Sequence, residues 1–259
     1  MKFNRDILRQ DEFQTRLLEL AQSAGKAILA IRHAADFSVD LKADNSPVTA
    51  ADLAANGIIE AGLPLIFQGV PIISEETCDL SKPAPDTFWL VDPLDGTKEF
   101  IAGNGDFTVN IALIERGVPI YGVVDAPAKG VSYWGGADIG AWRQSGDTRA
   151  AIAMSTPLNP IRVVASASHL NAETKAFIEG LGNHVLVQAG SSIKICMLAE
   201  GSADIYPRMG PTSEWDTAAA DAVLRGAGGG LYQLDGRSVV YGKREILNPH
   251  FVARPAGAK

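Results

Sequence analysis

The sequence predicts a protein of mixed α and β class whose later part is an α/β layer. Between Asp11 and Ala35, apolar residues recur at helical spacing among charged residues, which predicts a long amphipathic helix. The β-prone runs 108–115 and 118–125 flank Arg116-Gly117, a pattern typical of an antiparallel hairpin. Beyond residue 160, short apolar strands alternate with helical segments, which is typical of an α/β layer.

The N-terminal helix has a packing role, and a second helix follows a polar loop. The loop, residues 42–52, brings Thr49 and Asp52 to the start of a helix that carries Ile58, Ile59 and Leu63. Thr49 with Asp52 three residues later is typical of a helix cap. The alternative is that Asp52 accepts a proton near a metal site.

The run Pro71-Ile72-Ile73-Ser74-Glu75-Glu76 predicts a short strand that ends in two acids. Neighbouring residues of a strand point to opposite faces, so only one of the two acids can readily face a shared metal site. We expect Glu75 to do so and Glu76 to face solvent. Residues 77–87, rich in proline and polar residues, predict a surface loop or flap.

The central stretch runs from Trp89 to Phe100, where an apolar strand ends in Asp92 and Asp95 follows across Pro93. Two crowded carboxylates are costly to bury unless a cation neutralises them, and Mg²⁺ prefers oxygen ligands of this kind. The alternative is that Asp92 only ends a strand and Asp95 only caps a helix.

The residues around this acidic pair suit the same site. Pro93 lacks a backbone donor, which leaves the Leu94 carbonyl available to the metal centre. Gly96 permits a close turn, and Thr97 lies where a helix would begin, with N–H groups that suit a phosphate oxygen.

The turn-forming residues of Thr156-Pro157-Leu158-Asn159-Pro160 predict a domain boundary between residues 1–158 and residues 159–259. Residues 127–148 predict further short strands and turns. The second part predicts strands at 161–165, 184–188 and 203–207, and helices at 172–181, 190–200 and from Trp215 onward. Gly226 to Gly230 predicts a helix stop and turn, because it lacks the flanking elements of a dinucleotide-binding fingerprint.

The 259 residues, 46% hydrophobic, can fill a substantial core. A net charge of −7 argues against binding a nucleic acid polymer, and a small anionic substrate would need help from metal ions. Cys78 and Cys196 lack the spacing of a disulfide framework or zinc site. The charged start and the absence of a long apolar run predict a cytoplasmic protein without a transmembrane segment, although it could attach peripherally to the inner face of the membrane. No pattern indicates an oligomeric state.

Acids at Asp52, Glu75, Asp92, Asp95 and Asp216 each have a capping or surface explanation when taken alone. Together, and in this order, they resemble the inositol monophosphatase superfamily of Mg²⁺-dependent, lithium-sensitive phosphatases. The resemblance is carried by Ser74-Glu75-Glu76, Asp92-Pro93-Leu94-Asp95-Gly96-Thr97 and Trp215-Asp216-Thr217-Ala218-Ala219. It implies a layered α-β-α-β-α sandwich, with an N-terminal α+β half, a C-terminal α/β half and the site between them.

Further motifs resemble the 3′(2′),5′-bisphosphate nucleotidase branch of the bacterial sulfur-assimilation type. These motifs are residues 44–52, Lys98-Glu99-Phe100, Gly190-Ser191-Ser192-Ile193-Lys194, Tyr206-Pro207-Arg208 and residues 210–216. This branch implies release of phosphate from 3′-phosphoadenosine 5′-phosphate, leaving AMP.

The resemblance implies a role for each matching residue. Two or three Mg²⁺ ions would be held by Glu75, Asp92, the Leu94 carbonyl, Asp95 and Asp216. Asp52 and Thr97 would orient and deprotonate the attacking water, and the Gly96 and Thr97 amides would hold the departing phosphate. The rest of the nucleotide would contact Ser166, His169, Gly190 and Lys194, although His169 and Lys194 taken alone are more typical of surface residues.

Two other functions remain open. The substrate could be an inositol phosphate or a sugar bisphosphate. The chain could also be a metal-dependent binding or regulatory protein without useful turnover, against which the complete acidic set argues. A covalent phosphocysteine route is not indicated, because neither cysteine lies in a phosphate-binding loop.

Overall fold

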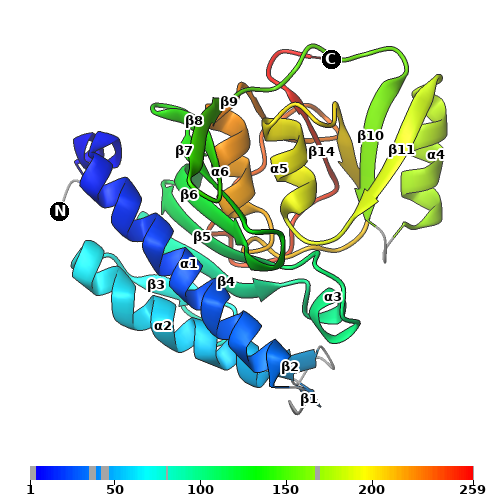
Figure 1. The fold of residues 1–259 in the computed structure, drawn as a ribbon. Helices are drawn as coiled ribbons and strands as arrows, with labels where there is room; N and C mark the ends of the chain where they lie inside the picture. The colour runs from blue at the N-terminus through cyan, green and yellow to red at the C-terminus, as the bar shows by residue number, and fades with distance from the viewer. Residues whose placement is uncertain (1–3, 35–38, 42–46, 80, 167–169, 259) are drawn as a thin grey trace.

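The computed structural model describes residues 4–34, 39–41, 47–79, 81–166 and 170–258. They form five layers, α-β-α-β-α, which Figure 1 shows from the paired helices in blue and cyan to the yellow-green helix at the opposite side. The helices of these layers are α1 (Asp11–His33) with α2 (Ala50–Ile66), then α5 (Ile193–Ala199) with α6 (Ala218–Gly226), and last α4 (Ala172–Gly180). The layered sandwich implied by the sequence is confirmed.

The second layer is a seven-stranded sheet in the order β3-β4-β5-β6-β7-β8-β9. Its strands are β3 (Ile72–Ser74), β4 (Thr87–Asp95), β5 (Thr108–Glu115), β6 (Val118–Ala126), β7 (Val131–Gly136), β8 (Gly140–Ser145) and β9 (Thr148–Ile152). β3 runs parallel to β4 and every other pair is antiparallel. The predicted hairpin of β5 and β6 is therefore confirmed.

The central strands are buried on both faces, which explains their almost uninterrupted apolar sequence. In β4, Phe88 and Leu90 belong to the core shared with the C-terminal part, whereas Trp89 and Val91 belong to the core under α1 and α2. The side chains of a strand alternate between faces, so one strand serves both cores. The acids at its end are held at the edge of a rigid, doubly covered sheet.

The fourth layer has two small sheets. β10 (Ile161–Ser166) is parallel to β11 (His184–Ala189), and β14 (Phe251–Pro255) lies between β12 (Tyr206–Arg208) and β13 (Gly229–Gln233) in antiparallel pairing. The short elements are η1 (Arg5–Arg9), β1 (Val39–Leu41), β2 (Pro47–Thr49), α3 (Thr97–Ile101) and η2 (Pro127–Lys129).

Four sequence predictions need correction in the C-terminal part. The helix expected from Trp215 begins at Ala218, after a turn at residues 215–217. The helix expected from residue 190 begins at Ile193, because Ser191 adopts a left-handed conformation with φ 47°. The strand expected at 203–207 lies at β12. The glycine run stops a helix as predicted, but strand β13 begins within it at Gly229.

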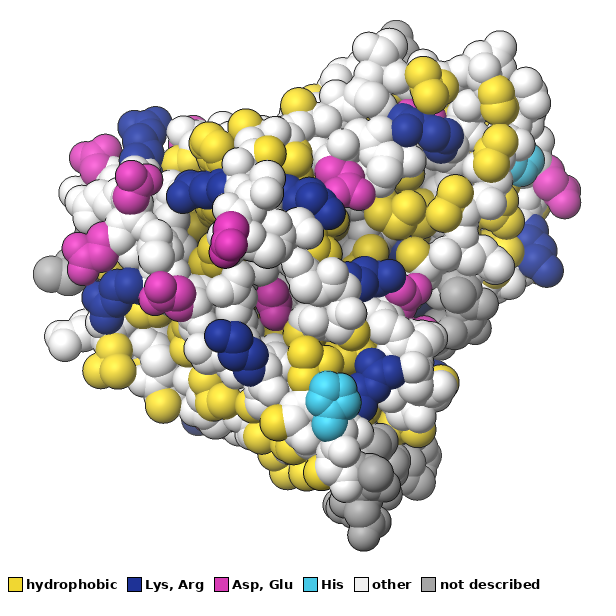
Figure 2. Space-filling view, in the orientation of Figure 1, with side chains coloured by type: hydrophobic (Ala, Val, Ile, Leu, Met, Phe, Trp, Pro, Cys, Tyr) yellow, Lys and Arg dark blue, Asp and Glu magenta, His cyan; other side chains and the backbone are white. Residues whose placement is uncertain are grey.

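The boundary near residue 158 stays a prediction. It lies between β9 and β10, yet one hydrophobic core joins Leu90 and Ala112 of the large sheet to Ile195 and Val223 of the C-terminal helices. Within the described ranges, no helix is long and apolar enough to cross a membrane. Basic and acidic side chains are interspersed over the face shown in Figure 2.

Candidate active site between the two sheets

A β-bulge brings Asp92 and Asp95 to one side of the sheet. Asp92 pairs with Asn110 and Asp95 with Thr108, so three steps along β4 match two along β5. Residues three apart in a regular strand point to opposite faces, and the extra residue at Pro93-Leu94 cancels this difference. Pro93 suits the bulge because it has no N–H to donate to the ladder.

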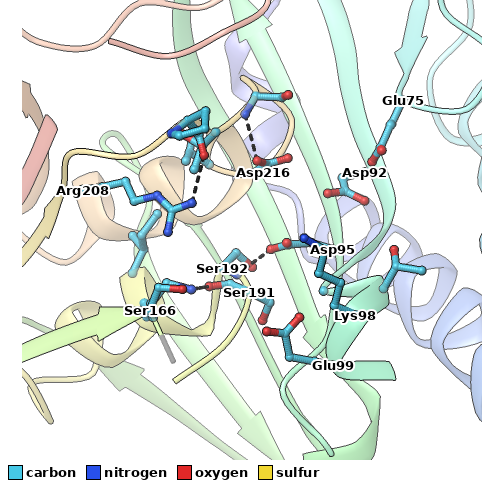
Figure 3. Close-up of a pocket in the computed structure, with 18 of the residues that line it drawn as sticks. Glu75, Asp92, Asp95, Lys98, Glu99, Ser166, Ser191, Ser192, Arg208 and Asp216 are labelled. Atoms are coloured by element: carbon cyan, nitrogen blue, oxygen red, sulfur yellow. Dashed lines mark hydrogen bonds between the residues drawn. The ribbon is translucent and has the colours of Figure 1, made fainter. Parts of the chain in front are cut away.

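Both carboxylates line a pocket of about 420 Å³ between the large sheet and the C-terminal part. In Figure 3, Glu75, Asp92, Asp95 and Asp216 surround a common space, and Arg208 and Ser166 lie across from them. The other lining residues are Leu94, Gly96, Thr97, Lys98, Glu99, Ser191, Ser192, Lys194, Ile195, Tyr206, Pro211, Thr212, Ser213, Thr217 and Leu247. The structure thus brings together acids from three separate segments of the chain.

Each of the three aspartates accepts a backbone hydrogen bond that fixes its orientation. The donors are Leu94 N to Asp92 Oδ1 at 3.0 Å, Ser192 N to Asp95 Oδ2 at 2.6 Å, and Ser213 N to Asp216 Oδ2 at 2.8 Å. These bonds engage one oxygen of each carboxylate, so the second oxygen is available to a ligand.

Burial and mutual repulsion oppose ionisation of these acids. Burial, followed by the charges of Glu75 and Asp95, raises the pKa of Asp92 well above its usual range. Burial, then the charge of Asp95, does the same to the pKa of Asp216. Burial raises the pKa of Asp95 to about 6, although Lys194 opposes the shift. A divalent cation would relieve this repulsion.

The donor set fits Mg²⁺, which prefers hard oxygen ligands and few protein carboxylates. Across the described parts of the chain, no three acidic, histidine or cysteine side chains already form a closed cation cage. Glu75, Asp92, Asp95, Asp216 and the Leu94 carbonyl line the space that an ion would occupy.

Asp52 combines both alternatives considered from the sequence. Its Oδ2 accepts hydrogen bonds from Thr49 N and Thr49 Oγ1, each at 2.7 Å, which caps α2. Its Oδ1 lies 3.3 Å from Thr97 Oγ1, and that hydroxyl is also 3.2 Å from the Leu94 carbonyl oxygen. Asp52 is 1% exposed and lies behind Thr97, which itself lines the pocket. The cap therefore aims a carboxylate at the hydroxyl of Thr97.

The turn after β3 and the turn after β4 place two further predicted residues. Glu75 lines the pocket and Glu76 does not, as expected, but the strand predicted to run to Glu76 ends at Ser74. Both acids lie in a turn, so the alternation of strand faces does not explain the difference, and Glu76 is half-buried rather than exposed. Gly96 has φ 92°, and a Cβ there would lie 2.8 Å from the Asp106 carbonyl oxygen. Only glycine fits this close turn into α3.

The opposite wall of the pocket carries buried cations. Lys194 is 5% exposed and donates from Nζ to the Ser191 carbonyl at 2.5 Å. Burial lowers the pKa of Lys194 to about 8, with the charge of Asp95 opposing and that of Arg208 contributing. Arg208, 7% exposed, donates from Nη2 to the Pro211 carbonyl at 2.9 Å.

Of the other residues predicted to contact the nucleotide, one lines the pocket, one does not, and one lies outside the described residues. Ser166, at the end of β10, lines the pocket. Gly190 is not among the lining residues; its N–H donates to Asp106 Oδ2 at 2.8 Å, and a Cβ there would lie 2.7 Å from Asp106 Cβ. Gly190 therefore allows close contact between the two parts of the chain. His169 lies outside the described residues.

Sequence reasoning assigned no role to Arg208, Glu99 or Ser192, although all three line the pocket. Each stands in a motif already noted for its resemblance, which was the available signal. The positions of Arg208 and Ser192 could not be derived from spacing, because they depend on how the C-terminal part packs against β4 and β5.

The model of the inositol monophosphatase family matches residues 9–257. The 3′(2′),5′-bisphosphate nucleotidase CysQ of Escherichia coli K12 is 46% identical over 241 residues, covering 90% of this chain and 96% of that protein. The protein of the same name from Haemophilus influenzae is 32% identical, covering 91% of this chain and 90% of its own length.

Solved structures share the fold. CysQ from Bacteroides thetaiotaomicron, a bacterial member of the inositol monophosphatase family, is 40% identical with a TM-score of 0.84, covering 96% of this chain and 98% of its own. The inositol monophosphatase from Anabaena is 24% identical with a TM-score of 0.73, covering 94% of this chain and 90% of its own.

Proposed function

The chain belongs to the inositol monophosphatase family, and on this premise we propose that it is a 3′(2′),5′-bisphosphate nucleotidase. It hydrolyses 3′-phosphoadenosine 5′-phosphate to AMP and phosphate. The nucleotidase relatives described above support this reaction and this substrate class.

The opposed walls of the pocket support the choice of a bisphosphate. Acids from β4, the turn after β3 and the turn before α6 form one wall, and Lys194 and Arg208 belong to the other. A phosphoryl group bound through cations at the acids would leave a second anion of the same substrate within reach of the basic side chains. A substrate with one phosphate would leave Lys194 with only acids of the chain, such as Asp95 and Glu99, to offset its charge.

Members of this family depend on metal ions, generally Mg²⁺. Glu75, Asp92, Asp95, Asp216 and the Leu94 carbonyl are the groups that would hold two or three ions here. When bound, magnesium supplies positive charge that offsets the phosphoryl oxygens and the leaving oxygen.

The chain itself supplies the path for the proton of the attacking water. A Thr97 hydroxyl that donates to Asp52 Oδ1 presents its oxygen to the pocket, where it accepts a hydrogen bond from water. As the water oxygen bonds to phosphorus, the bond from phosphorus to the ribose 3′ oxygen breaks. The water proton passes through Thr97 to Asp52, and the ribose oxygen takes a proton from solvent. The N–H groups of Gly96 and Thr97 hold the released phosphate.

A phosphate-release assay over a small panel tests the function. Adenosine 3′,5′-bisphosphate, an inositol monophosphate and a sugar bisphosphate are compared with Mg²⁺ and with a chelator. We expect the nucleotide to exceed the others by at least about tenfold in kcat/KM, with release lost in the chelator. A preference for either other substrate, or no release from any, would overturn the proposal. The cytoplasmic location and the role in sulfur assimilation stay predictions.

A further inference from the structure

The Asp95 carboxylate is held by the opposite part of the molecule. Ser192, in the loop before α5, donates its backbone N–H to Asp95 Oδ2 at 2.6 Å. Thr108 Oγ1 and Asn110 Nδ2, from the neighbouring strand β5, approach the same oxygen only to 3.5 Å. The closest hydrogen bond to Asp95 therefore depends on where the Ser192 loop lies.

The Ser192 side chain fixes that loop to the large sheet. Its Oγ donates to Asn110 Oδ1 at 2.8 Å and lies 2.9 Å from Thr108 Oγ1. A serine hydroxyl has one proton, so Thr108 donates to Ser192 and Ser192 donates to Asn110. The three side chains are at most 2% exposed, so water does not replace these bonds.

The residue proposed to bind the second phosphate follows this loop directly, in the first turn of α5. Lys194 lies two residues beyond Ser192, and its Nζ donates back to the Ser191 carbonyl at 2.5 Å. Ser191 has φ 47°, and the Gly190 N–H is bound by Asp106 at 2.8 Å, so several contacts fix the loop at once. The Ser192 donor and the Lys194 cation therefore belong to one segment whose backbone is fixed by these contacts.

We propose that Ser192 is a positioning residue that couples cation binding at Asp95 to phosphate binding at Lys194. The proposal rests on the proposed function for the identity of the substrate. The effect of Ser192 on cation binding at Asp95 does not depend on that function. By linkage, a cation that fixes Asp95 also tightens the binding of a phosphate at Lys194, and the phosphate tightens the cation to the same degree.

Calorimetry on the purified full chain tests the coupling without turnover. The probes are Mg²⁺ alone, AMP alone and AMP in the presence of Mg²⁺. In the wild type we expect Mg²⁺ to raise the affinity for AMP by at least about fivefold. Ser192→Ala should lower the affinity for Mg²⁺ alone by about tenfold or more. In this variant, the AMP affinities measured with and without Mg²⁺ should agree to within about twofold.

A matched control separates positioning from general loss of stability. Ser132 is 3% exposed, and its Oγ donates to the buried Asp125 at 2.7 Å; neither residue lines the pocket. Ser132→Ala should lower the melting temperature but leave the Mg²⁺ affinity and the coupling unchanged. If it alters them as much as Ser192→Ala does, the proposal is wrong.

Two variants of Thr108 keep the test decisive if Ser192→Ala fails to fold. Thr108→Val removes the hydroxyl that donates to Ser192 and should reproduce the loss of coupling. Thr108→Ser keeps the hydroxyl and should show the coupling of the wild type. Wild-type Mg²⁺ affinity and coupling in Thr108→Val would overturn the proposal. If the nucleotidase assay fails while Mg²⁺ alone still binds more weakly to Ser192→Ala, the proposed substrate is wrong and the positioning of Asp95 stands.

Discussion

The aspartates of the pocket differ in their partners from Asp204 and Asp221, which are also buried. Asp204 is paired with Arg162 at 2.6 Å and Asp221 with Arg225 at 3.1 Å, which satisfies each carboxylate. No such ion pair to Asp92, Asp95 or Asp216 occurs within the described residues. Three crowded carboxylates without a direct ion pair, whose charge Lys194 and Arg208 offset only in part, are the feature that a bound cation would stabilise.

Lys194 predicts how substrate affinity depends on pH. Because its pKa is lowered to about 8, the ammonium is charged below this pH and neutral above it. We expect the KM for adenosine 3′,5′-bisphosphate to rise as the pH passes about 8, since the attraction for the second phosphate is lost. A KM profile of the wild type checks this expectation.

Lys194→Ala should remove that pH dependence and raise the KM for the bisphosphate by about tenfold or more. The KM for a simple monophosphate should change much less, because it has no second phosphate to lose. Equal effects on both substrates would remove the proposed role of Lys194.

At the residue scale, the sequence indicated the acids but not their surroundings. Asp92, Asp95, Glu75 and Asp216 were identified because strand ends and motif spacing are local features. The donor to Asp95 could not be identified, because Ser192 is 97 residues away and meets it only through tertiary packing.

At the scale of elements, α6 packs against the large sheet at Gly122 of β6. A Cβ at this position would lie 2.2 Å from the Ala219 carbonyl oxygen of α6. We predict that Gly122→Ala lowers the free energy of unfolding by about 1–3 kcal/mol or more, because helix backbone must move to make room. Denaturant unfolding measures the loss.

The same substitution at Gly57 is the control for that prediction. Gly57 lies in the interior of α2 and is exposed, and a Cβ added there would meet no atom within 4 Å. Gly57→Ala should be neutral or stabilise by about 0.5–1 kcal/mol, as alanine favours helix. A similar loss in both variants would mean that packing against α6 is not the cause.

Most helices and strands could be predicted, because apolar periodicity and turn residues act over short distances. The bulge at Pro93-Leu94 could not, since it appears only when β4 is paired with β5. The strand β13 was missed because its glycine-rich start resembles a turn, and its position is set by pairing with β14, about twenty residues later.

At the scale of the whole molecule, buried acids link stability to pH. Burial raises the pKa of Asp125 to about 6, against an ordinary value of 3.8, with Ser132 and Lys26 opposing. Between these values the folded state binds more protons than the unfolded state, so stability falls as pH rises. In a chelator, we predict that the free energy of unfolding falls as the pH rises from about 4 to about 6.

Asp125→Asn tests the origin of that slope, because the amide keeps the hydrogen bond from Ser132 but cannot ionise. The slope should become shallower in this variant and retain the part due to Asp95, whose pKa is also about 6. An unchanged slope would exclude Asp125 as a contributor.

The central claim is that acids from both parts of the chain hold Mg²⁺ together, and Asp216 is the acid from the C-terminal part. The most direct measurement is Mg²⁺ binding by calorimetry, paired with phosphate release from adenosine 3′,5′-bisphosphate, for Asp216→Asn beside the buried control Asp125→Asn. We predict that Asp216→Asn lowers the affinity for Mg²⁺ by at least about tenfold and lowers kcat by about a hundredfold. The control Asp125→Asn should have the Mg²⁺ affinity and kcat of the wild type. Wild-type Mg²⁺ affinity and turnover in Asp216→Asn would contradict the account.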